Sequence, residues 1–150
     1  MDRLKAILEQ AQKRAQQMAL PYLGALTPTE ASEILALQSD AKLVDVRTRA
    51  EWDWVGKILG SIQIEWNTYP GGQPNADFIT ELKHQVNVNV LTMFICRSGA
   101  RSSAAAKVAT ESGYQSSYNV LEGFQGDKDE NGHRDSVNGW RKAGLPWTQS

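Results

Sequence analysis

The scarcest residue in this 150-residue chain is cysteine, which occurs only once, at Cys96. A single cysteine excludes an internal disulfide bond and any structural zinc site built from several thiolates. A lone thiol is typical of a reducing compartment, and we therefore expect a cytoplasmic protein.

Long apolar runs and an excess of one charge are also lacking. No hydrophobic stretch approaches membrane-spanning length, and residues 1–20 lack the uninterrupted apolar core of a secretory signal. The 16 basic and 17 acidic residues give a formal charge of -1, which provides no general attraction to nucleic acids or acidic membranes. We therefore expect neither a nucleic acid nor a membrane among the partners.

The remaining composition, 41% hydrophobic and 22% charged, is typical of one compact domain with its own core. We divide the chain into an N-terminal helical extension, residues 1–21, and a domain, residues 22–150. Apolar residues recur every three to four positions in the extension and predict an amphipathic helix that Pro21 ends. The residues of this stripe are Leu4, Leu8, Ala11, Ala15 and Met18.

Beyond the extension, strand and helix signals alternate along the chain. The predicted strands are residues 22–26, 42–46, 62–64, 91–95 and 117–121. Two capping boxes, Thr27 with Glu30 and Thr48 with Glu51, predict the starts of helices between them. This alternation predicts an α/β domain with a mostly parallel sheet, in which ligands bind beyond the carboxyl ends of the strands.

The fourth predicted strand leads into a loop that opens with Cys96 and into a helix expected over residues 102–112, with Gly113 as its stop. Backbone N–H groups at such a loop-to-helix transition lack partners and point at whatever the loop encloses. Together with the charges of Arg97 and Arg101, they stabilise a thiolate and hold an anion against it. We therefore interpret Cys96 as an activated nucleophile; the alternative is an inert buried cysteine.

Four segments of the chain, in this order, resemble the rhodanese domain family. They are Asp45-Val46-Arg47 with Glu51-Trp52, Gly56 to Ser61, Cys96 to Ser102, and Gly139 to Pro146. The resemblance covers about residues 22–147. It implies a parallel five-stranded sheet flanked by helices on both faces. It also implies thiosulfate sulfurtransferase activity through a cysteine persulfide, with neither a cofactor nor a metal.

By this resemblance, Cys96 attacks the outer sulfur of thiosulfate, releases sulfite and passes the sulfur to an acceptor. The residues expected to form the substrate-binding loop are Arg97, Ser98, Gly99, Ala100, Arg101 and Ser102. Arg97 is expected to pair with the sulfonate oxygens and Arg101 to brace the loop from its far side, while Ser102 is a hydroxyl donor or only the helix cap. Because no second cysteine is present, the acceptor must be cyanide, a small thiol or a cysteine of another protein.

The resemblance also places Asp45 and Arg47 at a strand end beside the catalytic strand, where we expect a charge pair that supports the site. The chain departs from the family pattern at Lys57 and Leu59, which replace a histidine and a proline. It departs again at Phe124, which stands where a second glycine often follows Gly123.

A longer departure is the segment 124–138, which exceeds the short link usual in the family and is expected to reach the rim of the active site. Its residues 127–132 imitate the first half of a calcium loop, but Asn138 occupies the position of the final glutamate ligand, which favours a solvated turn. His84 and His133 are expected to have structural or surface roles.

Two further functions stay open beside the sulfurtransferase. One is a persulfide carrier or docking module that serves a protein partner. The other is a phosphatase or arsenate reductase of the related fold. The four residues between Cys96 and Arg101 match the rhodanese spacing, whereas the related phosphatases have five, so the loop length favours sulfur over phosphate.

Overall fold

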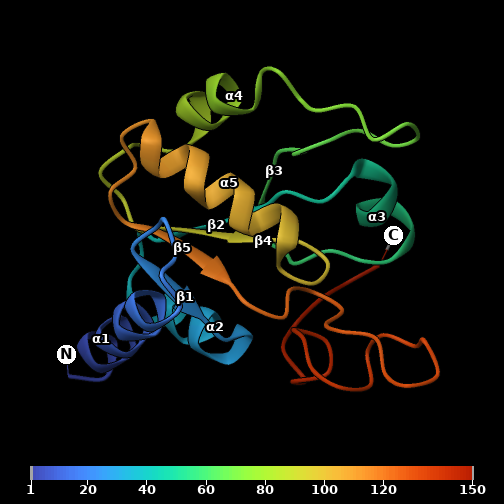
Figure 1. The fold of residues 1–150 in the computed structure, drawn as a ribbon, viewed down its shortest axis with the longest axis horizontal. Helices are drawn as coiled ribbons and strands as arrows, with labels where there is room; N and C mark the ends of the chain where they lie inside the picture. Colours follow the sequence, from blue (N-terminus) through green and yellow to red (C-terminus); the bar gives the residue numbers. More distant parts are fainter. Residues whose placement is uncertain (1, 150) are drawn as a thin grey trace.

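The computed structural model describes residues 2–149 as one five-stranded sheet with helices on both faces (Figure 1). In chain order the elements are α1 (Asp2–Gln17), β1 (Gly24–Leu26), α2 (Pro28–Leu37), β2 (Lys42–Asp45), α3 (Arg49–Trp54), β3 (Ile62–Gln63), α4 (Phe78–Gln85), β4 (Thr92–Ile95), α5 (Ala100–Glu111) and β5 (Ser117–Val120). Every strand pair is parallel, and the strand order is β1-β5-β4-β2-β3. The predicted fold class is confirmed.

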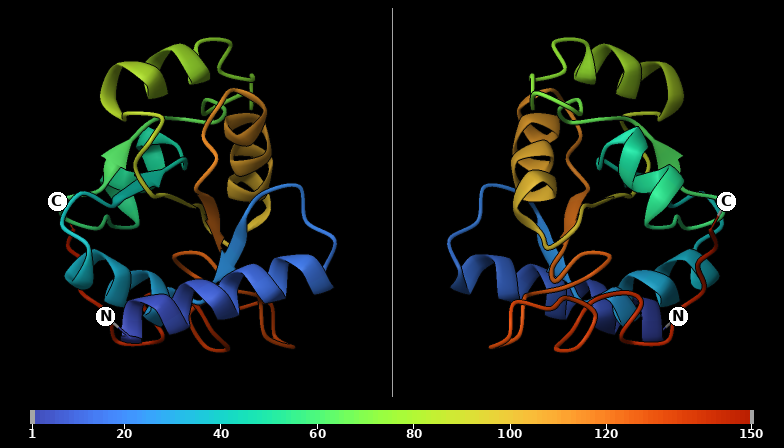
Figure 2. Two further views of the ribbon diagram at one scale, coloured as in Figure 1. Left: turned by 90° about the vertical axis from the view of Figure 1, so that its left-hand side faces the viewer. Right: turned by 90° about the vertical axis from the view of Figure 1, so that its right-hand side faces the viewer.

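Helices α1 and α2 cover one face of the sheet and helices α4 and α5 cover the other, as the two side views show (Figure 2). The buried side chains form one apolar cluster on each face. Along β4 they alternate, since Met93 and Ile95 belong to the first cluster and Phe94 belongs to the second. Both faces of this central strand are therefore apolar, which explains its continuous hydrophobic run.

Helix α1 packs against the sheet with most of the predicted stripe, since Leu4 and Leu8 also lie partly buried against the first apolar cluster. Its buried residues are Ile7, Ala11 and Ala15, whereas the side chain of Met18 is exposed. The helix also ends at Gln17, four residues before Pro21. The division into residues 1–21 and 22–150 stays a prediction.

The end of α1 is a Schellman motif. Ala19 adopts a left-handed φ of 55°. The N–H of Leu20 donates to the carbonyl of Ala15 at 2.9 Å, and the N–H of Ala19 donates to Gln16 at 3.1 Å. The chain therefore leaves the helix through backbone hydrogen bonds rather than through the proline.

Both predicted capping boxes are confirmed, at Thr27 with Glu30 and at Thr48 with Glu51. The start of α5 was predicted two residues too late, because the helix begins at Ala100 after Gly99 as its N-cap. Ser102 is therefore not the cap. Gly113, with a φ of 109°, follows the end of α5 as expected.

The chain after β5 runs under the carboxyl ends of the strands and returns to the segment after α3. There the backbones of Lys57 and Thr148 exchange two hydrogen bonds of 2.8 Å.

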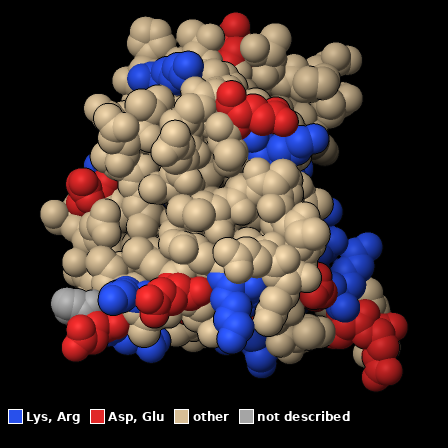
Figure 3. Space-filling view, turned by 60° about the vertical axis from the view of Figure 1, so that its left-hand side comes forward, with Lys and Arg blue, Asp and Glu red and all other residues tan. Residues whose placement is uncertain are grey.

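Within residues 2–149, no helix is both long enough and apolar enough to cross a membrane. On the face seen in Figure 3, charged side chains gather along the lower edge, where α1 lies.

Candidate active site

The single thiol lies where β4 ends and the loop before α5 begins. All four residues of β4 are buried, and the side chain of Cys96, directly after them, is 1% exposed. Because β4 lies between β5 and β2, the loop opens at the centre of the sheet edge formed by the carboxyl ends of the strands. This is the edge at which ligands bind in open α/β sheets.

Two donors converge on the sulfur. The backbone N–H of Gly99 lies 3.1 Å from Cys96 Sγ, and the Oγ of Ser102 lies 3.3 Å from it. Ser102 Oγ is also 3.2 Å from the carbonyl oxygen of Gly99, so its one proton serves either acceptor. A thiolate draws that proton more strongly than a carbonyl does, because hydrogen bonds to an ionised acceptor are stronger.

The N–H and the carbonyl of Gly99 both form hydrogen bonds. Its φ of 110° and ψ of -14° lie in the left-handed region that favours glycine. Its carbonyl accepts hydrogen bonds from the N–H of Ser103 at 3.1 Å and from the side-chain amide of Asn119 at 3.3 Å. The same amide donates to the hydroxyl of Tyr22, which is 3.0 Å from Ser103 Oγ.

Sequence reasoning did not identify this hydrogen-bonded set of Tyr22, Ser103 and Asn119. One signal was present: Asn119 is a polar residue inside the buried strand β5, where apolar residues are the rule.

The two arginines of the loop have different partners. Arg101 donates to both carboxylate oxygens of Glu51, at 2.7 and 3.0 Å, and both side chains are largely buried. Burial by itself would raise the pKa of Glu51, but hydrogen bonds and charge from Arg101 outweigh it and lower the pKa to about 2. Arg97 is exposed and forms no salt bridge with any of residues 2–149.

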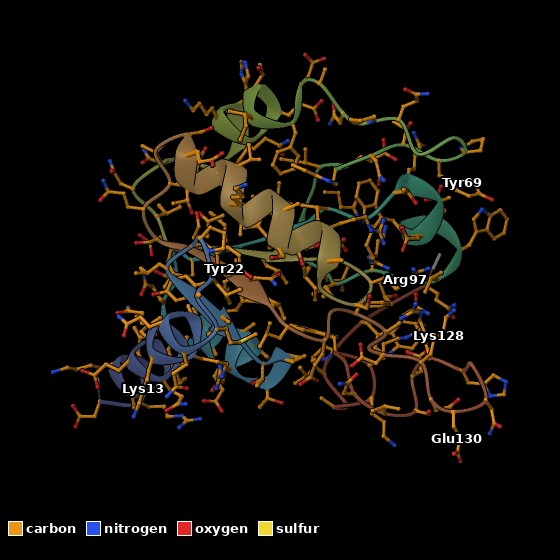
Figure 4. All side chains as sticks on the ribbon, in the orientation of Figure 1. Lys13, Tyr22, Tyr69, Arg97, Lys128 and Glu130 are labelled. Atoms are coloured by element: carbon orange, nitrogen blue, oxygen red, sulfur yellow. The ribbon has the colours of Figure 1, made fainter. Side chains whose placement is uncertain are left out.

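A cavity of about 610 Å³ opens above the loop. Arg97 and Arg101 line it together with two exposed aromatic residues, Trp54 and Tyr69. Figure 4 shows Tyr69 at the tip of the segment between β3 and α4, on the same side of the molecule as Arg97. Gln125 also lines the cavity, so the long segment after β5 reaches the rim of the site.

Among the other predicted loop residues, Ser98 is half-buried and Ala100 is exposed. Neither side chain contacts the sulfur within hydrogen-bonding distance. Of the six predicted loop residues, the structure thus brings Gly99 and Ser102 to the sulfur and Arg97 and Arg101 to the cavity.

The loop is held from behind by the segment after β5. The N–H of Phe124 donates to the carbonyl of Cys96 at 2.8 Å, and the N–H of Gln125 donates to that of Arg97 at 3.0 Å. Gly123 makes this approach possible, because a Cβ there would lie 2.5 Å from the carbonyl carbon of Arg97. Glycine is required at this point for space as well as for its φ of 66°.

Asp45 and Arg47 form a fully buried ion pair with an N–O distance of 2.7 Å. Arg47 also donates to the carbonyl of Gly56 at 2.8 Å, and its guanidinium lies 4.2 Å from the centre of the Phe124 ring. Asp45 is paired in register with Ile95, the residue before Cys96. The pair therefore lies directly beside the strand that presents the thiol.

Two acidic residues of the long segment, Asp127 and Asp129, accept hydrogen bonds from side chains within it. Asp129 accepts hydrogen bonds from the backbone N–H groups of Asn131 and His133 and from the hydroxyl of Ser136. Across residues 2–149, no three His, Cys, Asp or Glu side chains are grouped to hold a metal ion. His84 and His133 are both exposed.

Comparison with known proteins identifies relatives over most of the chain. The rhodanese-like domain profile matches residues 27–130. The crystal structure of Rv0390 from M. tuberculosis is 43% identical, with a TM-score of 0.79 over 86% of this chain and 99% of that one. An uncharacterized protein, RC0915 from Rickettsia conorii, is 36% identical over 79% of this chain and 92% of its own length.

More distant structures share the fold. The polysulfide-sulfur transferase homodimer from Wolinella succinogenes is 21% identical, with a TM-score of 0.59 over 97% of this chain and 87% of that one. A possible tyrosine phosphatase from Rhodopseudomonas palustris is 23% identical, with a TM-score of 0.53 over 95% of this chain and 92% of that one. At these identities the likeness concerns the fold and not the activity.

Proposed function

The chain belongs to the rhodanese-like domain family, and on that premise we propose that it is a sulfurtransferase carrying sulfane sulfur as a persulfide on Cys96. The observation that supports this most directly is the pair of donors on one sulfur, Gly99 N–H and Ser102 Oγ. A hydrogen bond to a charged acceptor is stronger than one to a neutral acceptor, so these two donors favour the thiolate over the thiol. The thiolate is the nucleophilic form. The same donors can then stabilise the charge of a terminal persulfide sulfur.

Thiosulfate is the donor that we propose. The Cys96 thiolate attacks the outer sulfur of thiosulfate, a bond forms between the two sulfur atoms, and the sulfur–sulfur bond of thiosulfate breaks. Sulfite leaves with that electron pair. Arg97, exposed at the cavity wall, is the cation that binds the sulfonate oxygens. An acceptor thiolate or cyanide then attacks the outer sulfur of the persulfide, and Cys96 leaves as a thiolate.

A persulfide carrier for a protein partner is the alternative, favoured by the absence of a second cysteine that could resolve the persulfide within the chain. Turnover with thiosulfate and cyanide separates the two. An enzyme completes many cycles with these small molecules, whereas a carrier reacts with them slowly and is loaded quickly by a cysteine desulfurase. For either function we propose a cytoplasmic setting, where reducing conditions keep Cys96 available.

Intact-protein mass spectrometry after incubation with thiosulfate tests the proposal. We expect the mass to increase by one sulfur atom, the increase to disappear on addition of cyanide, and the Cys96→Ser variant to show none. Ser117→Ala is a matched control. It removes a buried hydroxyl that donates to the carbonyl of Tyr114 and does not contact the loop. No mass increase, or hydrolysis of a phosphate ester that depends on Cys96, would contradict the proposal.

A further inference from the structure

The cavity above the catalytic loop is larger than the proposed donor requires. At about 30 Å³ for each water-sized group, a volume of about 610 Å³ holds about 20 non-hydrogen atoms. Thiosulfate is a sulfate-sized anion, and cyanide is smaller still. The volume falls within the range of pockets for organic ligands, and it corresponds in size to a tripeptide.

The walls of the cavity have the chemistry of a binding site for an organic molecule. Trp54, at the end of α3, is 81% exposed, and Tyr69, in the segment between β3 and α4, is 70% exposed. Each ring leaves a large apolar area in contact with water, and a ligand that covers it gains the corresponding hydrophobic free energy. Tryptophan, tyrosine and arginine are also the residues that dominate binding energy at protein interfaces.

The charges of the cavity add a preference for a carboxylate. Glu51 neutralises Arg101 through two hydrogen bonds, so the net positive charge at the wall comes from Arg97. The guanidinium of Arg97 forms no salt bridge with another residue from 2 to 149 and is open to a ligand. A guanidinium recognises a carboxylate through two parallel hydrogen bonds.

The depth of the thiol restricts the shape of the group that enters. Cys96 is 1% exposed and does not itself line the cavity, but Arg97, the next residue, does, so we take the cavity as the approach to the outer persulfide sulfur. A slender, flexible arm that ends in a thiol fits this approach. A cysteine side chain on a short peptide is such an arm.

From these observations we infer that the acceptor of the persulfide is a cysteine within a short acidic peptide segment. Its backbone and apolar atoms pack against Trp54 and Tyr69, and its carboxylate pairs with Arg97. This inference rests on the proposed function and specifies its acceptor. In the transfer step the peptide thiolate attacks the outer sulfur, the bond between that sulfur and Cys96 breaks, and the persulfide passes to the peptide without net oxidation.

The test uses the full chain loaded with thiosulfate and freed of excess donor. The discharge rate is measured with cyanide, 2-mercaptoethanol, glutathione and a twelve-residue peptide that carries one cysteine between two glutamates. We expect glutathione and the twelve-residue peptide each to discharge the persulfide about tenfold faster than 2-mercaptoethanol does. In Trp54→Ala and Tyr69→Ala, the ratio of the peptide rate to the cyanide rate should fall about tenfold.

Leu59→Ala is the matched control, because Leu59 is also a large exposed apolar residue, at 78%, but does not line this cavity. Its ratio should stay within about twofold of the wild-type value, as for an ordinary surface substitution. If the twelve-residue peptide discharges the persulfide faster than glutathione does, the acceptor is a segment of a protein. If the two discharge rates are equal, the acceptor is a free tripeptide. Equal rates for peptides and 2-mercaptoethanol, or unchanged ratios in both aromatic variants, overturn the inference.

This outcome is separable from the fate of the proposed function. If thiosulfate never loads Cys96, the proposed function fails before any acceptor is added. If the persulfide forms and cyanide removes it, but the aromatic residues have no effect on the peptide rates, the proposed function stands and the inference alone is wrong.

Discussion

Arg101 and Glu51, fifty residues apart in the chain, join the start of α5, directly after the loop that begins at Cys96, to α3. The guanidinium donates to both carboxylate oxygens, and the same carboxylate accepts the backbone N–H of Thr48 as part of the capping box of α3. One side chain therefore caps a helix and holds the arginine at the start of α5. This contact couples the stability of α3 to the geometry around Cys96.

The first prediction concerns the pH dependence of this contact. Since the pKa of Glu51 falls from 4.5 to about 2 on folding, its contribution to stability is complete above pH 4.5 and disappears as the pH falls toward 2. After allowance for partial solvent exposure we expect Glu51→Gln to lower the free energy of unfolding by about 2 kcal/mol at pH 7. The difference from the wild type should shrink between pH 4.5 and 2 in thermal melts followed by circular dichroism.

Glu33→Gln provides the control for that experiment, because Glu33 pairs with Arg3 on the exposed surface. Its melting temperature should follow the wild-type curve closely at every pH. A Glu51→Gln variant with the same behaviour would contradict the role given to this carboxylate.

The second prediction concerns Asn119 as a positioning residue for Gly99. Without its amide the Gly99 carbonyl loses one donor, and the N–H that faces the sulfur is held less firmly. Asn119→Ala should slow the labelling of Cys96 by iodoacetamide about fivefold, as expected from a hydrogen bond of about 1 kcal/mol. Ser117→Ala alters a buried polar side chain of the same strand and should cost stability without changing the labelling rate. Equal labelling rates in the two variants would show that Asn119 only supports the fold.

The third prediction separates steric conflict from backbone strain. A Cβ at Gly123 would lie 2.5 to 2.6 Å from backbone atoms of Arg97 and Cys96, whereas a Cβ at Gly132 meets nothing within 4 Å. Both glycines have a positive φ, so Gly132→Ala reports the strain alone, about 1 kcal/mol. Gly123→Ala should cost at least about 2 kcal/mol more in urea unfolding and should reduce persulfide loading, since backbone must move. Similar losses at the two positions would be incompatible with this close packing.

The fourth prediction concerns the buried pair of Asp45 and Arg47. Asp45→Asn leaves the guanidinium buried without its counter-charge, and we expect a loss of about 3 to 5 kcal/mol in the free energy of unfolding. The double variant Asp45→Leu with Arg47→Met removes both charges and should be more stable than Asp45→Asn. Chemical denaturation of the three proteins measures this, and a double variant that is less stable than the single one would refute the ion-pair explanation.

Much of the local structure followed from residues close together in the sequence. Each capping box depends on a threonine and a glutamate three positions apart, so Thr27 with Glu30 and Thr48 with Glu51 predicted the starts of α2 and α3. The run around Phe94 likewise predicted a strand covered on both faces. The end of α1 was predicted wrongly because a Schellman closure at Ala19 has no glycine to mark it.

The sequence alone therefore determined most of the elements and the loop that begins at Cys96, because caps and burial patterns depend on residues a few positions apart. The alternation of strands with helices indicated the parallel sheet. Only the tertiary structure decided which residues from distant segments complete the site. Glu51 lies in α3, directly after β2, and Asn119 lies in β5, and these two strands flank β4. Tyr69 reaches the same edge from the segment after β3, the strand next to β2. Such contacts depend on strand order, which no short stretch of sequence encodes.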